Sequence, residues 1–317
     1  MKLRVPAWSA GLLVLYAAIP WWLGNNFYLM SLLVTALIVG GVALAWALLG
    51  NLGGMVSFGH AAFFGVGAYV SALLTLRFDF PVFLAIGLGG AGALIAASAM
   101  LPALRLRGPY FALAILAYAQ IFRILATELR GITGGSAGLS SIPALPRVLG
   151  FDFGGKAGAY LVILTLVLAF AAVYHHIRKS DYGLALRGMH DGEDAVRVVG
   201  VNSTWLKALM LFVSAFMTGV IGAFNAHYIN FLEPDYAFSG FWITLPIVAA
   251  IVGGYRTILG PLVGALVVYL VDQLVFKNLL PAAHQIVLGA LLVTVILVSP
   301  AGLVPWLTRR RTRHAAA

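Results

Sequence analysis

One long stretch without charge constrains this chain more than any other feature: no Asp, Glu, Lys or Arg occurs from position 5 to position 76. A helix that crosses the hydrocarbon core of a bilayer needs about 20 mostly apolar residues, so three such helices fit into this stretch. The whole chain is 62% apolar and 9% charged, against about 45–50% and about 25% in soluble domains. This composition excludes an ordinary soluble enzyme, a disordered chain and a nucleic-acid-binding domain. It predicts an all-α polytopic membrane protein.

Apolar runs of spanning length continue along the chain, and we predict about ten transmembrane helices, plus or minus one. The predicted spans are 8–23, 28–50, 60–76, one within 80–104, one from 109, 157–177, 205–227, 241–255, 258–275 and 284–303. The first span resembles a signal peptide, but no clear small-residue cleavage site follows it, so we expect it to stay uncleaved. Residues 1–317 are expected to form a single transmembrane domain.

The basic residues predict the orientation of these spans. Twenty Lys and Arg against ten Asp and Glu give a net charge of +10. With ten spans and both termini in the cytoplasm, fourteen basic residues fall on the cytoplasmic side and five on the outer side, as the positive-inside rule requires. Two connections are longer than a turn, the outer loop 127–156 and the cytoplasmic loop 178–204. The chemistry therefore lies inside the bilayer or is supplied by partners.

Polar residues inside the predicted spans are few, and they are the candidates for a transport path. Ser57 and His60 lie in the glycine-rich stretch 50–69, which is either a cytoplasmic turn or a broken helix beside a path. Arg123 lies inside the fifth span, where its side chain must face protein or water. It is either a pathway or gating residue or a structural one, which donates hydrogen bonds to carbonyl groups of neighbouring helices or extends outward toward the end of the span.

A second glycine-rich stretch, 133–143, begins with Thr133, Gly134 and Gly135 on the predicted outer side. Its backbone N–H groups could bind a carboxylate or a partner protein. The alternative is a tight loop that packs on the ends of the helices.

The cytoplasmic loop is predicted to hold a short helix. Asp191 is suited to cap this helix, Asp194 follows three residues later, and Gly200 is suited to end it. A helix of about two turns is not stable alone and needs a docking surface. The helix either contacts a soluble partner or lies on lipid.

Taken together and in this order, these stretches resemble the permease subunits of ABC importers for branched-chain amino acids, of the M-type (LivM-like). The likeness runs from about residue 43 to about residue 300. It rests on the segments 54–69 (GMVSFGHAAFFGVGAY), 104–113 (LRLRGPYFAL), 133–143 (TGGSAGLSSIP) and 186–202 (LRGMHDGEDAVRVVGVN).

The resemblance implies a fold similar to the type II ABC importers, in the bacterial plasma (inner) membrane, with no catalytic residue, metal or cofactor of its own. Residues 194–200 are similar to the EAA loop that fits a groove on the ATPase, with Asp194 where Glu is usual. Gln120 stands where we expect an acidic residue in relatives. The implied ATPase-coupling residues are Arg187, Asp191, Glu193, Asp194, Ala195 and Gly200. The candidates for the translocation path are Ser57, His60, Arg123, Thr133, Gly134 and Gly135.

The implied function is import of branched-chain (hydrophobic) amino acids by alternating access, without nucleic acid. The implied partners are a sister permease of the H-type, two ABC ATPase subunits that bind the ATP, a periplasmic or extracellular substrate-binding protein and membrane lipid. Urea, short amides or other amino acids remain alternative substrates. An ion-coupled secondary transporter is the alternative of another class. It would need a network of ionisable groups inside the membrane, and the spans offer little beyond Arg123 and Asp272.

Overall fold

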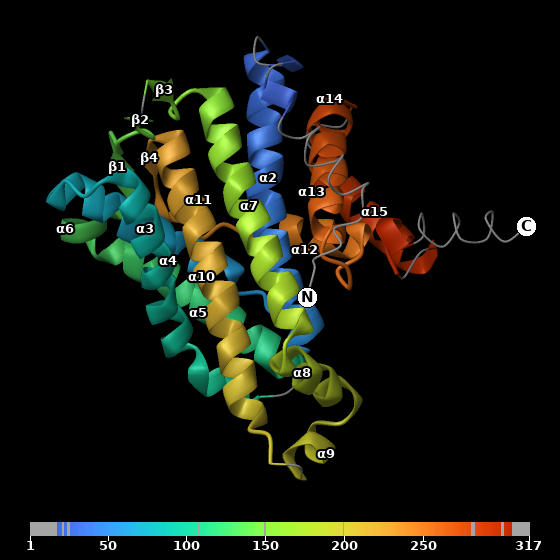
Figure 1. The fold of residues 1–317 in the computed structure, drawn as a ribbon. Helices are drawn as coiled ribbons and strands as arrows, with labels where there is room; N and C mark the ends of the chain where they lie inside the picture. The colour runs from blue at the N-terminus through green and yellow to red at the C-terminus, as the bar shows by residue number, and fades with distance from the viewer. Residues whose placement is uncertain are drawn as a thin grey trace, which may run out of the picture.

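The computed structural model describes residues 18–20, 22–23, 26–106, 108–148, 150–198, 200–279, 283–298 and 301–305. Helices dominate this part of the chain (Figure 1). Seven of them are long and apolar enough to cross a membrane: Phe27–Leu52, His60–Phe78, Val82–Ala99, Pro109–Glu128, Lys156–Lys179, Ser203–Ile229 and Pro234–Gly253. The chain is therefore a multi-pass membrane protein with α-helical spans.

The elements are of three kinds, which alternate along the chain. The longer helices are α2 (Phe27–Ala47), α3 (His60–Phe78), α4 (Val82–Ala99), α5 (Pro109–Glu128), α7 (Lys156–Lys179), α8 (Asp181–Asp191), α10 (Ser203–Ile229), α12 (Phe241–Gly253), α13 (Gly260–Val271) and α15 (His284–Val298). The short helical pieces are η1 (Leu48–Leu52), η2 (Leu101–Arg105), α6 (Arg130–Thr133), η3 (Gly135–Ala137), α9 (Glu193–Val198), α11 (Pro234–Ala237), η4 (Asp272–Phe276) and α14 (Lys277–Leu279). The strands are β1 (Leu139–Ser140), β2 (Arg147–Val148), β3 (Phe151–Asp152) and β4 (Phe231–Leu232).

Several predicted spans coincide with these helices. The predicted span 157–177 corresponds to α7, and 205–227 corresponds to α10. The total of about ten spans and the type II class stay predictions. The first predicted span, 8–23, lies largely outside the described residues, whereas Gly260–Phe276 and α15 are apolar but shorter than a full span.

Glycines bring α3, α4 and α10 into close contact. A Cβ atom at Gly67 of α3 would lie 2.5 Å from the Gly219 Cα of α10, and a Cβ atom at Gly89 of α4 would lie 2.6 Å from the Gly67 carbonyl oxygen. Any side chain at these positions would push the backbones apart. Small residues are the usual means by which membrane helices approach one another closely, and here they make one tightly packed unit of three helices.

The helix α2 forms the centre of the other packing group. It is buried along nearly its whole length and contacts α7, α10, α12 and α13. A helix that is apolar all round is suited to such a position. Its first turn is capped by Asn26, whose Oδ1 accepts a hydrogen bond from the Leu29 N–H. Its last turn widens into the π-helical turn η1, where Asn51 donates a hydrogen bond to the Tyr174 hydroxyl of α7.

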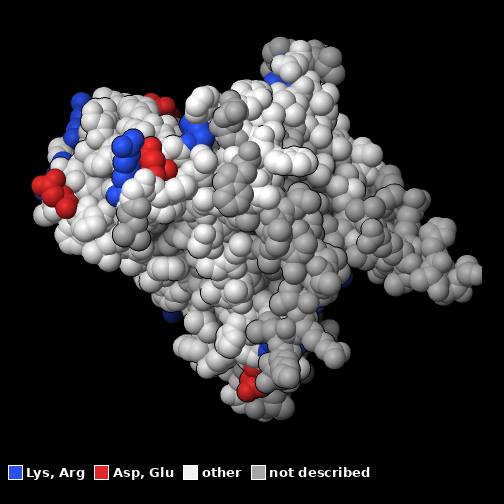
Figure 2. Space-filling view, turned by 45° about the horizontal axis from the view of Figure 1, so that its top comes forward, with Lys and Arg blue, Asp and Glu red and all other residues white. Residues whose placement is uncertain are grey.

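The described chain has two opposite ends. The short helices α8 and α9 form one end, and the strands β1 to β4 with α6 lie at the other (Figure 1). On the face drawn in Figure 2, charged side chains gather near the strands and in a smaller group at the bottom, and the described surface between them is mostly white. This distribution suits a protein whose middle lies in a bilayer.

Candidate functional site

Two short helices build the α8–α9 end, and local capping explains where they begin and end. The Gly183 N–H donates to the Ser180 Oγ and caps α8, which runs to Asp191. Gly192 has an extended backbone that separates α8 from α9. Gly200 follows α9 with a φ of 87°, a conformation that glycine adopts without steric cost. The predicted role of Gly200 in ending the helix is confirmed.

The predicted capping role of Asp191 is wrong. Asp191 is the last residue of α8, because α8 already begins at Asp181 and continues through it. The sequence suggested one short helix where the structure has two. The backbones of Asp191, Asp194 and Ala195 lie in these helices, but their side chains lie outside the described part of the structure.

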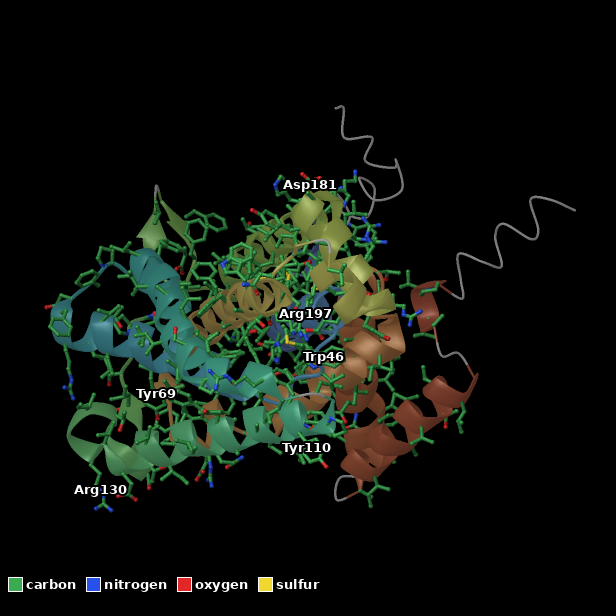
Figure 3. The ribbon with its side chains drawn as sticks, turned by 90° about the horizontal axis from the view of Figure 1, so that it is seen from below. Trp46, Tyr69, Tyr110, Arg130, Asp181 and Arg197 are labelled. Atoms are coloured by element: carbon green, nitrogen blue, oxygen red, sulfur yellow. The ribbon has the colours of Figure 1, made fainter. Side chains whose placement is uncertain are left out.

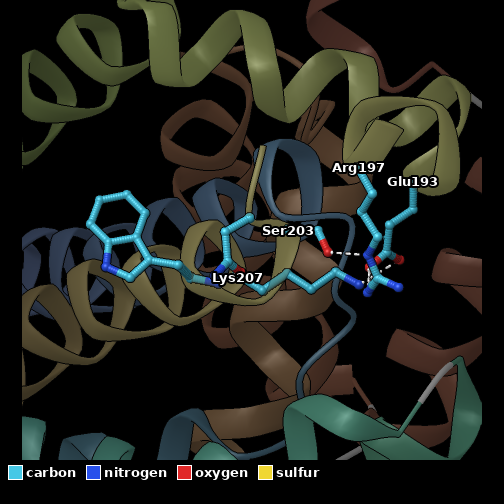
Figure 4. Close-up of polar contacts among 6 residues, drawn as sticks. Glu193, Arg197, Ser203 and Lys207 are labelled. Atoms are coloured by element: carbon cyan, nitrogen blue, oxygen red, sulfur yellow. Dashed lines mark hydrogen bonds and ion pairs between the residues drawn. The ribbon is translucent and has the colours of Figure 1, made fainter. Parts of the chain in front are cut away.

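Glu193 ties α9 to α10. Its carboxylate accepts hydrogen bonds from Arg197 Nη2 at 2.8 Å and from Lys207 Nζ at 2.7 Å. Arg197 Nε also donates to the Ser203 Oγ at 2.7 Å (Figure 4). Glu193 and Arg197 belong to α9, whereas Ser203 and Lys207 belong to α10. Hydrogen bonds between ionised groups are stronger than neutral ones, so this cluster holds the two helices together.

The surroundings of Glu193 keep its carboxylate ionised. Burial by itself would raise the pKa of Glu193, but the hydrogen bonds from Lys207 and Ser203 and the positive charges of Lys207 and Arg197 outweigh that effect. The pKa of Glu193 therefore lies below its ordinary value. The side chains of Glu193 and Lys207 are only 21% and 18% exposed, so solvent screens this pair less than it would an exposed pair.

The Glu193 cluster also meets the end of α2. A cavity of about 120 Å³ is lined by Glu193 and Lys207 together with Leu52, Gly53, Gly54, Leu186 and Met189. The lining residues come from η1, the loop after it, α8, α9 and α10. Parts of the chain that are far apart in sequence thus join at one place beneath the bundle.

Arg187 lies in a different environment from Glu193. Its Nε donates to the Gly183 carbonyl oxygen at 3.1 Å and its Nη2 to the Arg178 carbonyl oxygen at 3.4 Å. The arginine thereby joins α8 to the end of α7.

Gly200 lines a separate hollow of about 330 Å³ beside Arg197 and the first residues of α10.

Apolar side chains are exposed at this same end. Val198 in the last turn of α9 is 87% exposed, and Leu184 of α8 is 66% exposed. Tyr182 and Trp205 are about half exposed, and their rings are 5.9 Å apart. An apolar surface on short helices at one end of a membrane protein is suited to contact with a partner or with the lipid interface.

Ser57 and His60 lie in the interior near the α8–α9 end. Trp46 Nε1 donates to the Ser57 carbonyl oxygen at 2.9 Å, and the Gly59 N–H donates to the Ser57 Oγ. The Ser214 hydroxyl donates to the Ala45 carbonyl oxygen, so His60 Nε2 donates to the Ser214 Oγ at 2.9 Å. These bonds join α2, α3 and α10.

Arg123 lies near the end of α5 that is closer to the strands. Its Nη1 is 2.8 Å from Asp235 Oδ1 of α11, and its Nε donates to Gln120 Oε1 at 3.1 Å. The side chains of Arg123 and Asp235 are 40% and 77% exposed. The sequence left open a gating role, hydrogen bonds to carbonyl groups of neighbouring helices, or extension toward the end of the span. The structure pairs the side chain with a carboxylate, a partner that none of these alternatives named.

Thr133, Gly134 and Gly135 form a tight turn where α6 ends and η3 begins. The Thr133 hydroxyl donates to the Ala126 carbonyl oxygen at 2.6 Å, and its oxygen accepts a hydrogen bond from the Gly135 N–H. Gly134 and Gly135 have φ angles of 77° and 61°. These glycines allow the chain to reverse, so that β1 pairs with β4 in an antiparallel arrangement.

Among the seven apolar spans, α5 is the least buried, with 28% of its most apolar window inside the protein, against 89% for the span that contains α2. Its exposed residues recur at helical spacing and include Tyr110, Leu113, Gln120 and Ile124. Tyr110 in the first turn of α5 and Arg130 of α6, just beyond its other end, point away from the bundle (Figure 3). This face combines apolar residues with a polar amide in mid-span, which a lipid-facing surface rarely carries.

Fold and site thus describe a polytopic membrane protein with a structured loop at one end. The sequence from residue 28 to residue 296 matches the family of branched-chain amino acid transport system permease components. The match covers most of the chain, and the chain belongs to this family.

The chain is also similar to individual permeases. It is 28% identical over 284 residues to the high-affinity branched-chain amino acid transport system permease protein LivM of Salmonella typhimurium, covering 80% of this chain and 65% of that protein. It is 27% identical to LivM of Escherichia coli, covering 93% and 73%. LivH of Escherichia coli is 25% identical, covering 83% and 89%. No solved structure matches the chain.

Proposed function

We propose that this chain is the membrane-spanning permease subunit of an ATP-driven importer for branched-chain or related hydrophobic amino acids. The observation that carries the proposal is the family match across residues 28–296, supported by relatives named as branched-chain amino acid permeases. The permease provides a path and changes its shape, and no covalent chemistry is required of it.

The α8–α9 end is the part that we assign to the ATPase subunits, on the cytoplasmic side. Two short helices there are held in place by caps and by the Glu193 cluster. Val198 and Leu184 present exposed apolar side chains beside charged ones. A helix of six residues such as α9 gains little stability by itself. That contacts with the bundle nevertheless hold α9 in place supports a role in contact with a partner.

The exposed face of α5 is the part that we assign to the translocation path and to the sister permease subunit. Gln120 and Arg123 place polar groups on a membrane helix that this chain covers only partly. In hydrocarbon such groups are costly, and a second permease subunit would shield them. The LivH match covers 83% of this chain and the LivM matches cover 80% and 93%, which supports a pair of related permease subunits.

Transport then follows from a shift between two states of the path. A binding protein on the outer side delivers the amino acid, and ATP binding to the two ATPase subunits favours one state. A ligand shifts such an equilibrium only by its difference in affinity for the two states. We keep Ser57, His60, Thr133, Gly134 and Gly135 as predicted path residues.

Reconstitution of the complete importer tests this proposal. The chain, its sister permease and the ATPase are placed in proteoliposomes, and the binding protein with radiolabelled leucine is added outside. We expect uptake that requires ATP inside the liposomes and that unlabelled valine inhibits. Uptake of urea but not leucine would change the substrate that we assign and leave the type of importer unchanged. Uptake that follows an ion gradient without ATP would contradict the proposal.

A further inference from the structure

The helix α10 joins the two ends of the molecule. It has 27 residues, from Ser203 to Ile229, and at about 1.5 Å per residue it is about 40 Å long. That length matches a bilayer with its headgroup regions. Through the glycine contacts with α3 and α4, α10 is packed along its middle against two other spans. A movement at one end of this helix is therefore carried to the other end.

At its first turns α10 is joined to α9. Lys207 contributes the ion pair with Glu193 at 2.7 Å, and Ser203 accepts the hydrogen bond from Arg197 at 2.7 Å. Four ion pairs occur in the described part of the chain, and Glu193 takes part in two of them. The pair with Arg197 lies within α9, whereas the pair with Lys207 crosses to α10, so the loss of the Glu193 carboxylate removes the ion pair between the two helices and leaves only the neutral-acceptor hydrogen bond from Arg197 to Ser203.

At its last turn α10 is joined to the glycine-rich loop at the opposite end. His227 Nδ1 donates to the Pro143 carbonyl oxygen at 2.7 Å, so its Nε2 accepts a hydrogen bond from the Ser71 hydroxyl at 2.9 Å. Asn230 Nδ2 donates to the Ile142 carbonyl oxygen at 2.9 Å. Directly after α10, β4 pairs with β1 of this loop. The loop segment 139–143 is thus fixed to the end of α10.

We propose that Glu193 is a positioning residue that makes α9 and α10 one mechanical unit, through which a displacement of α9 reaches the loop segment 139–143 at the opposite face. This inference rests on the proposed function, because the displacement is supplied by the ATPase subunits. It goes further in naming the residue that connects the coupling helix to a transmembrane helix and the segment that responds.

The test measures the response of that segment in the complete importer. The chain has no native cysteine, so Ser140→Cys gives this chain one thiol in an exposed residue of β1. The rate at which this thiol reacts with a membrane-impermeant maleimide is measured from the label on the gel band of this chain. It is measured once without nucleotide and once after trapping with ATP and vanadate. The variants in this background are Glu193→Gln, Lys207→Met, both together, and Lys207→Arg. Lys179→Met is the matched control, since Lys179 is exposed near the same end.

We expect trapping to change the labelling rate of the Ser140→Cys protein about fivefold, at the lower end of usual couplings between sites. Glu193→Gln and Lys207→Met should each abolish most of this change, and the double variant should be no worse than either single one. Lys207→Arg and Lys179→Met should respond as the parent does, and thermal unfolding should show that every variant is folded at the temperature of the labelling assay.

A full response in Glu193→Gln and Lys207→Met would overturn the inference, and so would a parent protein whose labelling does not change on trapping. ATP-dependent leucine uptake is measured on the same preparation. Its absence in the parent would refute the proposed function, which separates that failure from a failure of the connection between α9 and α10.

Discussion

The contact between Gly67 of α3 and Gly219 of α10 sets how closely these two spans approach, and one added methyl group tests it. A Cβ atom at position 67 would lie 2.5 Å from the Gly219 Cα, and the Gly219 carbonyl oxygen would be closer still. Non-bonded carbon atoms rest about 3.5–4.0 Å apart. In Gly67→Ala the two backbones must therefore separate by about 1 Å.

Forced separation of this kind costs about 1–3 kcal/mol in a well-packed interior. At about 2–4 °C per kcal/mol, the melting temperature of Gly67→Ala should fall by about 2–12 °C. The assay is thermal unfolding of the purified chain in detergent. Gly87→Ala on α4 is the matched control, because a Cβ there meets nothing within 4 Å and alanine is the better helix former. Equal melting temperatures for the two variants would refute this account of the helix packing.

Three further predictions follow. Asp235→Asn should change stability by less than about 1 kcal/mol in thermal unfolding, since its ion pair with Arg123 is exposed; a larger loss would contradict a surface pair. The lowered pKa of Glu193 means that its ion pairs stabilise the fold above the ordinary carboxyl pKa and are lost as the pH falls through the lowered one. The difference in stability between the wild type and Glu193→Gln should therefore shrink below about pH 4.5. A stability difference that does not depend on pH would refute this prediction. Gly134→Ala, at a φ of 77°, should be destabilised by about 1 kcal/mol or more, whereas Gly131→Ala, where a Cβ meets nothing within 4 Å, should not; equal melting temperatures would contradict the strained turn.

The transmembrane helices could be predicted because their signal is local. A run of apolar residues of the right length is sufficient, and the predicted spans 60–76 and 157–177 fall within α3 and α7. The end of α9 could be predicted for a similar reason, because Gly200 is a residue type suited to the left-handed turn that follows.

The contacts between helices could not be predicted in this way. Arg123 and Asp235 are 112 residues apart in sequence, and no periodicity relates them. The sequence identified Lys207 only as one of the cytoplasmic charges, although it is the partner that fixes Glu193. The extra helix α8 was missed because Asp191 and Asp194 together resembled the start of a helix. Ser180, which caps α8, gave a signal of the same kind, but it lies outside the stretch we took for the helix.

The path residues show a related limit. Polar residues in apolar spans are correctly singled out as unusual, but only the fold shows what they contact. His60 binds Ser214 between two buried helices, whereas Gln120 lies on an exposed face. Gln120, where we expected an acidic residue in relatives, is left uncovered by this chain. The helix α5 is therefore the first to examine for path residues.

Uptake of radiolabelled leucine by cells with and without this gene tests the central claim most directly. The account predicts that deletion removes a component of uptake that valine inhibits, and that ATP depletion removes the same component while an uncoupler alone does not. A second leucine system is controlled by restoring the gene on a plasmid. Uptake restored by the plasmid that collapses with the ion gradient but survives ATP depletion would contradict the account.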